Sequence, residues 1–222
     1  MWRDAWAVLV KDLGIEARTR VGLWQVLPFA VLTVVLFAFA LGPHHGVLKA
    51  AAPGLFWLGV LFTALLLIGR STTIESGEGV GDAQRLLGID ASGVFCGKAM
   101  AIAVELLVVE VLLLLGVMAL LSYRPSHLWL VAVAAPLATI GLAGVGTLYG
   151  AIAGGARVRE TLLPMLVLPV LAPVLIAAVK LFALAQSGPV AKATPWLWVL
   201  GVFAVVYTAA GIVLYGQVQE TS

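Results

Sequence analysis

A segment with two glycines followed by a lysine is the first candidate for a functional site. Gly93-Val-Phe-Cys-Gly97-Lys98-Ala99 partly matches a phosphate-binding loop, in which backbone N–H groups hold phosphates and a following Ser or Thr binds magnesium. The segment is one residue too short and carries alanine in place of the hydroxyl residue. The sequence also lacks an HExxH or nucleophile-elbow motif. We therefore assign no catalytic residue and expect no ATP hydrolysis by this chain alone.

Two glutamates, Glu105 and Glu110, interrupt the apolar run Lys98–Leu121. A helix rises about 1.5 Å per residue, so Glu110 lies roughly 18 Å from Lys98, past the middle of a bilayer. A charge at that depth costs about 2.5–3.5 kcal/mol or more, so such a carboxyl is usually protonated, paired or facing a cavity. Five residues turn a helix by about 500°, which places the two carboxyls on different faces. Each could line a pathway or a subunit contact, or bond to a neighbouring helix.

The three histidines and the single cysteine are the other candidate ligands. Imidazole is a common axial ligand of haem, which makes His44, His45 and His127 candidates for haem binding. Adjacent residues rarely point at one iron, however, and simple solvation of loop histidines is the competing interpretation. Cys96 cannot form an internal disulfide, and no Cys/His spacing indicates a metal site.

The composition defines the environment in which these residues act. Of the 222 residues, 62% are hydrophobic and 11% are charged, against about 45–50% and 25% in soluble domains. These values exclude a soluble enzyme and a disordered chain. The sequence predicts an all-α polytopic membrane protein, with residues 1–222 forming one transmembrane domain. The net charge of +2 does not indicate a nucleic-acid partner.

Six apolar runs are long enough to form membrane spans, each of which takes about 20 residues. We expect spans at Val21–Leu41, Ala52–Gly69, Lys98–Leu121, Leu128–Ala153, Leu162–Val179 and Trp196–Tyr215, with Pro53 in the first turn of the second. With the N-terminus in the cytoplasm, nine basic residues fall inside and four outside. The positive-inside rule then predicts cytoplasmic termini and outward-facing histidines.

Residues 1–20 precede the first apolar run and predict an amphipathic helix on the cytoplasmic leaflet. Apolar residues recur at helical spacing on one face: Trp2, Trp6, Leu9, Val10, Leu13 and Ala17. Tryptophan beside basic residues is typical of a helix at the membrane interface. An ordinary surface helix that packs on a partner is the alternative.

The polar stretch 70–97 is the longest connection between spans, and it lies on the predicted cytoplasmic side. It begins with acidic residues and continues into a short amphipathic turn, and it contains Glu75, Glu78, Gly79, Asp82, Arg85, Leu86 and Leu87. Leucines on the surface of a short helix indicate that this face packs against another apolar surface. The membrane interface and a groove on a cytoplasmic partner are both possible sites.

Two later spans carry residues that shape helix packing. Gly146, Gly150 and Gly154 recur every four residues, which lets helix backbones approach closely. Pro164, Pro169 and Pro173 each remove a backbone donor, which predicts a bent helix beside a cavity or a moving interface, or a static kink.

Several of these segments together carry a family resemblance. They are Ala52-Pro-Gly-Leu-Phe-Trp57, Glu78-Gly79 through Asp82 to Leu86-Leu87, Gly97-Lys98, and the proline-rich stretch from Leu163 to Pro173. They resemble CcmB, the membrane subunit of the ABC-type haem exporter complex of cytochrome c biogenesis, across nearly the whole chain. One departure is Gly88-Ile89-Asp90, where the family often has a proline after the leucine pair.

The resemblance implies an ABC-2-type permease with six helices that works as a homodimer in the bacterial inner membrane. It implies two copies of an ATPase subunit, CcmA, together with CcmC, CcmD and delivery of haem to the chaperone CcmE. Residues Glu78–Leu87 would be a coupling helix that docks the ATPase, and the N-terminal helix would be an elbow helix. ATP, bound by the partner, would move haem itself or release the haem-loaded chaperone, and no cofactor would be held covalently.

Other functions stay open from the residues alone. A proton-coupled carrier would use Glu105 and Glu110 and would need no ATPase. An ABC-2 exporter of another substrate, or a scaffold within an assembly complex, would share the same composition.

Overall fold

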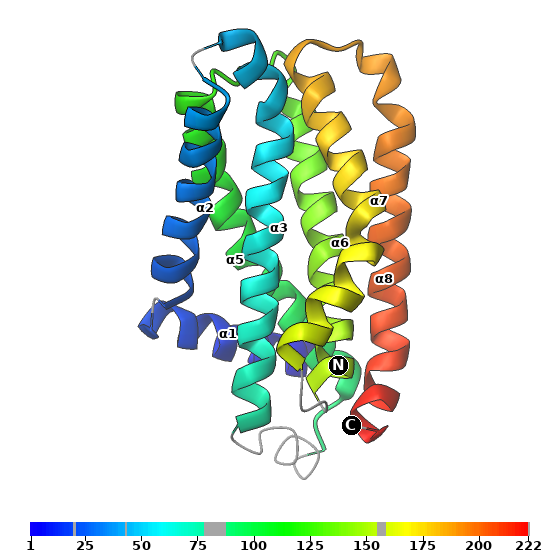
Figure 1. Cartoon of the computed structure of the whole chain (residues 1–222). Coiled ribbons are helices and arrows are strands. Elements are labelled where there is room, and N and C mark those ends of the chain that lie inside the picture. The colour runs from blue at the N-terminus through cyan, green and yellow to red at the C-terminus, as the bar shows by residue number, and fades with distance from the viewer. Residues whose placement is uncertain (20, 43, 78–87, 155–158, 222) are drawn as a thin grey trace.

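A bundle of upright helices, with one helix lying across its end, forms the body of the chain (Figure 1). The computed structural model describes residues 1–19, 21–42, 44–77, 88–154 and 159–221, and every regular element within these ranges is helical. The elements are α1 (Trp2–Thr19), α2 (Val21–Ala40), α3 (His45–Gly77), α5 (Ala91–Leu120), α6 (Leu128–Gly154), α7 (Arg159–Ser187), the short 3-10 helix η1 (Val190–Lys192) and α8 (Thr194–Thr221). The crosswise helix is α1.

Five of the described helical segments are long and apolar enough to cross a membrane. They are Gly46–Thr73, Ala91–Leu120, Leu128–Ala153, Leu162–Ser187 and Val190–Val218, with mean hydropathies from 2.1 to 2.6. Each exceeds the roughly 20 residues that a span requires. The chain is therefore a multi-pass membrane protein. In α2, Val31–Ala40 forms a further, shorter apolar segment.

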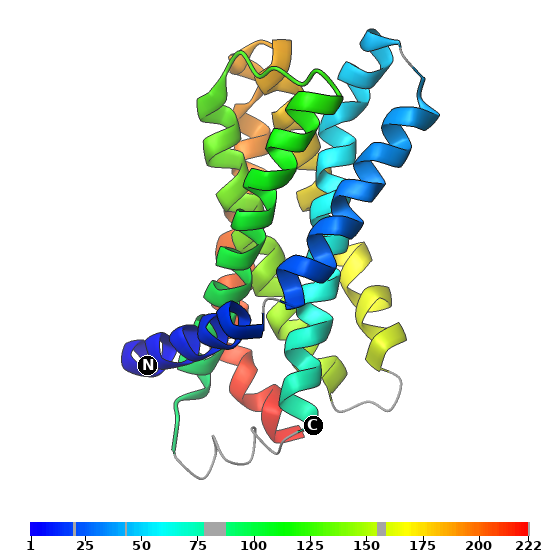
Figure 2. The same cartoon turned by 90° about the vertical axis from the view of Figure 1, so that its left-hand side faces the viewer.

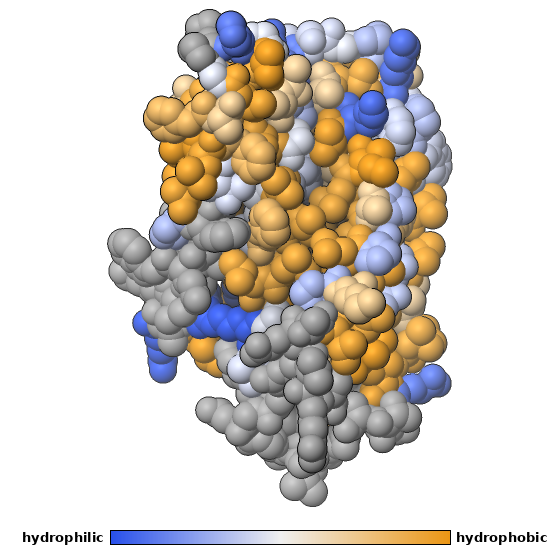
Figure 3. Space-filling view, in the orientation of Figure 1, coloured by the Kyte–Doolittle hydropathy of each residue, from blue (hydrophilic) through white to orange (hydrophobic). Residues whose placement is uncertain are grey.

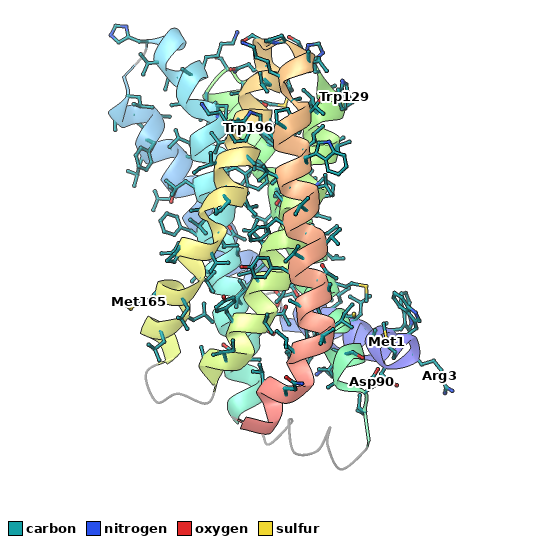
Figure 4. The ribbon with its side chains drawn as sticks, turned by 90° about the vertical axis from the view of Figure 1, so that its right-hand side faces the viewer. Met1, Arg3, Asp90, Trp129, Met165 and Trp196 are labelled. Atoms are coloured by element: carbon teal, nitrogen blue, oxygen red, sulfur yellow. The ribbon has the colours of Figure 1, made fainter. Side chains whose placement is uncertain are left out.

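The surface of the bundle has the polarity that a bilayer requires. In Figure 3, hydrophobic residues cover the middle of the visible face, and hydrophilic residues gather near α1 and at the opposite end. Trp2 and Trp6 of α1 are 72% and 66% exposed. Trp129 and Trp196 lie at the other end of the bundle (Figure 4). Indole rings favour the two membrane–water interfaces, so these tryptophans mark both edges of the apolar band.

The helices are longer than the apolar runs suggested. The expectation that Pro53 lies in the first turn is wrong, because α3 begins about two turns earlier, at His45. The connection expected over 70–97 is shorter, since α3 continues to Gly77 and α5 begins at Ala91. The segment expected as a loop after Val179 continues α7 to Ser187. Each extension adds mixed or polar turns that pack at the ends of the bundle.

The start of α5 is fixed by a side-chain cap. Asp90 accepts a hydrogen bond from the backbone N–H of Ser92 at 3.3 Å and from its hydroxyl at 2.8 Å. Such caps satisfy one of the free N–H groups of the first turn. The hydrogen bond from the Ser92 side chain lowers the pKa of the Asp90 carboxyl, so the cap is ionised at neutral pH.

Close contacts at glycines hold the bundle together. A Cβ on Gly146 would lie 2.2 Å from Cδ1 of Ile68, and a Cβ on Gly150 would lie 2.7 Å from Cγ2 of Thr72, so α6 and α3 need small residues where they meet. The space beside Gly211 of α8 is occupied in the same way by the ring of Phe95, which is buried in α5.

Replacement of Gly211 by alanine tests this packing. A new Cβ would lie 1.9 Å from Cζ of Phe95, a rigid buried ring. We expect Gly211→Ala to lower the stability by about 1–3 kcal/mol through overpacking. Gly201→Ala in the same helix is the matched control, because nothing lies within 4 Å of its Cβ position. The control should gain about 0.5–1 kcal/mol. Thermal unfolding of the detergent-solubilised chain measures both, and equal midpoints would contradict the contact.

Candidate functional site

The crosswise helix α1 lies directly on the first turns of α5 (Figure 2). A Cβ on Gly97 would lie 2.5 Å from the backbone oxygen of Ala5 and 2.7 Å from Cβ of Val8. A Cβ on Gly93 would lie 2.8 Å from the backbone oxygen of Met1. The two glycines of the incomplete phosphate-binding motif therefore make room for a second helix. Their spacing of four residues is the sequence signal that indicates such a crossing.

An ion pair joins the other end of α1 to α3. The guanidinium of Arg70 donates a hydrogen bond to the carboxylate of Glu16, and both side chains are largely shielded from solvent. Arg70 lies about two turns before the end of α3 at Gly77. Helix α1 therefore contacts both α3 and α5, the two helices that enter and leave the segment 78–87.

A pocket of about 60 Å³ lies where α1, α3 and α5 meet. Its charged lining consists of three basic and three acidic side chains: Lys11, Arg70, Lys98, Asp12, Glu16 and Glu105. Lys98 is only 3% exposed. Sites for drug-sized ligands have volumes of about 300–1,000 Å³, so this pocket is too small for haem. Its groups balance each other and form a charged junction between the three helices. Sequence reasoning found Glu105 but missed its neighbours, because they come from three separate segments.

Glu110 lies on a different face of α5 from Glu105, as their spacing predicted. It is 3% exposed, and its Oε1 accepts a hydrogen bond from the Thr139 hydroxyl of α6 at 2.5 Å. Its Oε2 has no hydrogen-bond partner among the residues that the structure describes. The two glutamates therefore belong to separate surroundings: Glu105 lines the charged pocket, and Glu110 is enclosed between helices.

Most of the residues predicted to couple to a partner lie outside the described residues: Glu78, Gly79, Asp82, Arg85, Leu86 and Leu87. Glu75 lies in the last turn of α3. The ends of the helices on either side, Gly77 and Ala91, lie at the same end of the bundle as α1 (Figure 1).

The prolines singled out by their spacing all lie on α7, and the glycines all lie on α6. Pro164, Pro169 and Pro173 all lie inside α7, and the latter two are exposed on its surface. Gly146 and Gly150 face α3, and Gly154 is the last residue of α6.

Aromatic residues pack near the end of the bundle opposite α1. Phe182 stacks on Phe56 with ring centroids 4.7 Å apart. Trp57 and Phe182 form an edge-to-face pair with ring centroids 5.2 Å apart. The hydroxyl of Tyr123 donates to the backbone oxygen of Phe182 at 2.8 Å, and burial raises the pKa of this hydroxyl. The motif Ala52–Trp57 thus supplies the core of this end.

The histidines lie at this same end, at the start of α3 and just before α6. His44 is exposed, and His127 is half-buried, with its backbone N–H bonded to the oxygen of Ala185 at 3.0 Å. His45 is the first residue of α3. Among the residues that the structure describes, no three His, Cys, Asp or Glu side chains are placed to hold one metal ion.

The fold and this junction define a multi-pass, all-helical membrane protein with a charged crossing of helices at one end. Residues 3–214 match the family model described as CcmB protein, and the chain belongs to that family. It is 33% identical to the Heme exporter protein B of Paracoccus denitrificans over 174 residues, which cover 77% of this chain and 78% of the relative. It is 32% identical to the protein of the same name from Rhodobacter capsulatus over 184 residues, 82% of this chain and 84% of the relative.

Replacement of Gly97 by alanine tests whether α1 depends on the crossing. The new Cβ would meet a backbone oxygen of α1, which cannot yield as a side chain can. We expect α1 to lose about 1–3 kcal/mol of docking free energy, which raises its undocked fraction at least about fivefold. The rate of trypsin cleavage after Lys11 and Arg18 measures this fraction.

Gly14→Ala is the matched control for that experiment, because nothing lies within 4 Å of its Cβ position in α1. Its cleavage rate should not exceed that of the parent chain. Equal cleavage of the Gly97→Ala chain and the parent chain would refute tight docking of α1 on α5.

Proposed function

We propose that this chain is the membrane subunit of an ABC-type haem exporter complex that acts in the maturation of c-type cytochromes. The observation that carries the proposal is the family match over residues 3–214, together with relatives named Heme exporter protein B. Haem is the cargo of the complex, and ATP is hydrolysed on a separate, CcmA-like ATPase subunit. CcmC-like, CcmD-like and CcmE-like maturation proteins are the further partners.

In this proposal, α2 is a sixth span and α1 is an elbow helix on the cytoplasmic leaflet. The apolar residues of α2 and its position beside α3 and α5 support the sixth span. The exposed Trp2 and Trp6 support an interfacial position for α1. Residues 1–222 then form one transmembrane domain with both termini in the cytoplasm of a bacterial cell and two copies in the assembly.

Coupling to the ATPase would pass through the segment 78–87. Its neighbours α3 and α5 are both bound to α1, α3 through Arg70 and Glu16 and α5 through Gly97. A push on this segment would therefore move three helices together. ATP can shift the membrane helices only if the ATPase contacts this segment differently in two states.

Charge and burial changes in the segment test this assignment. We expect Asp82→Lys and Leu86→Asp each to reduce co-purification of the ATPase subunit from mild detergent, since one reverses a charge and the other puts a carboxylate into an apolar contact. Insertion of the chain into the membrane should be unchanged. Mass spectrometry of the co-purified proteins, with haem-stained c-type cytochromes as a second readout, measures the loss.

Val47→Asp is the control, because Val47 is 48% exposed at the opposite end of the bundle and the change is likewise from apolar to acidic. It should leave ATPase recruitment intact. Normal recruitment by both segment variants would remove the coupling assignment, and the absence of any ATPase from the parent complex would overturn the proposed transporter class.

A further inference from the structure

Three buried polar side chains lie in the interior of the bundle, away from the charged pocket. Thr63 of α3 and Thr139 of α6 are fully buried, and Glu110 of α5 is 3% exposed. Within the described part of the chain, Oγ1 of Thr63 and Oε2 of Glu110 have no hydrogen-bond partner. Buried polar atoms in proteins are nearly always hydrogen-bonded, because an unpaired one destabilises the fold, so two such atoms need an explanation.

The contact between α3 and α5 places Thr63 and Glu110 at one level. A Cβ on Gly59 would lie 3.3 Å from Cδ1 of Leu113, which sets the register of these two helices. They run in opposite directions (Figure 1), so residues after Gly59 lie opposite residues before Leu113. Four residues along α3 and three along α5 lead to Thr63 and Glu110, which differ in height by about 1.5 Å.

The contact between α3 and α6 places Thr139 near the same level. These helices run in the same direction, and Gly146 lies against Ile68. Counting back along both helices from that contact leaves Thr139 and Thr63 about 3 Å apart in height. The hydrogen bond of 2.5 Å from the Thr139 hydroxyl to Glu110 agrees with this register. Three helices therefore bring a carboxyl and two hydroxyls to one depth.

Among the residues that the structure describes, no cationic side chain lies at this depth to neutralise an ionised Glu110. The charged groups of α1 and α3 nearest to Glu110 along α5 are Lys11, Asp12, Glu16 and Arg70, all at the pocket around Glu105 and Lys98. The N-terminal ammonium of Met1 and Asp4 lie further away, at the start of α5. Glu105 is about 7.5 Å further down α5. Helix α6 carries Tyr149 well below Thr139, α8 carries Tyr207 and Tyr215, and residues 31–40 of α2 have no titratable side chain.

The neutral carboxyl satisfies this site where the carboxylate does not. A protonated Glu110 can accept from Thr139 at Oε1 and donate from Oε2, and one water between Oε2 and Oγ1 of Thr63 would pair both orphan atoms. A carboxylate at this depth would stay uncompensated, which strongly disfavours the ionised form. We propose that Glu110, Thr63 and Thr139 form a buried proton-binding site that holds one water molecule and keeps the Glu110 carboxyl protonated at neutral pH.

Infrared spectroscopy of the full chain in membranes tests the site, since a carboxylic acid and a carboxylate give separate C=O bands. We expect the parent chain at neutral pH to show a carboxylic band that Glu110→Gln removes, while the variant keeps the hydrogen bond from Thr139. Thr139→Val should shift this band to higher frequency, because the C=O loses a donor. Thr63→Val should also shift it, because the water loses its second anchor.

Glu105→Gln is the control, because Glu105 lines the charged pocket and the Glu110 band should survive its loss. A band unchanged in Glu110→Gln would overturn the proton site, and a band unmoved by Thr63→Val would overturn the bound water. Neither result depends on an ATPase or on haem, so the site and the proposed transport function can fail separately.

Discussion

The backbone-to-backbone contact of α1 with α5 is the constraint on which the end of the bundle depends. Inside a bilayer, apolar side chains gain little by leaving lipid for protein, so helices associate through close packing and polar contacts. Gly93 and Gly97 bring two helix backbones together, and any side chain at either position would separate them. The ion pair between Arg70 and Glu16 then fixes the orientation of α1 relative to α3 and α5. The charged pocket exists because these two contacts hold α1 across the ends of α3 and α5.

The same rule governs the polar groups within the bundle. Charged side chains gather where α1 shields them and where each finds an opposite charge, as Lys98 does among Asp12, Glu16 and Glu105. Further in, partners are neutral hydroxyls such as Thr139. The depth of a group in the membrane therefore determines which chemistry can satisfy it: ion pairs at the end, and hydrogen bonds between neutral groups in the middle.

Much of the fold could be predicted from the sequence, because a bilayer leaves few choices. The apolar runs gave the helices of the bundle in order, and the spacing of Glu105 and Glu110 placed them on separate faces. Helix ends were less predictable, because residues 45–52 at the start of α3 mix apolar residues with a histidine, a glycine and a lysine and so mark no clear boundary. Thr63 could not be predicted as part of a buried site, because its role depends on lying at the same height in the bundle as Glu110, which only the packing of the helices shows. The resemblance to CcmB, stated from short motifs, is confirmed by the match over residues 3–214.

The prolines of α7 give this helix an uneven stiffness. A proline has no N–H to offer the carbonyl four residues before it, so the turns before Pro169 and Pro173 each lack a hydrogen bond. Both prolines and Met165 lie on the exposed side of the helix. Bending α7 at these turns breaks no backbone bond, whereas bending α5 or α8 would. A displacement of one end of α7 can thus be taken up by bending near these prolines. The two halves of the helix can then move separately about a flexible hinge.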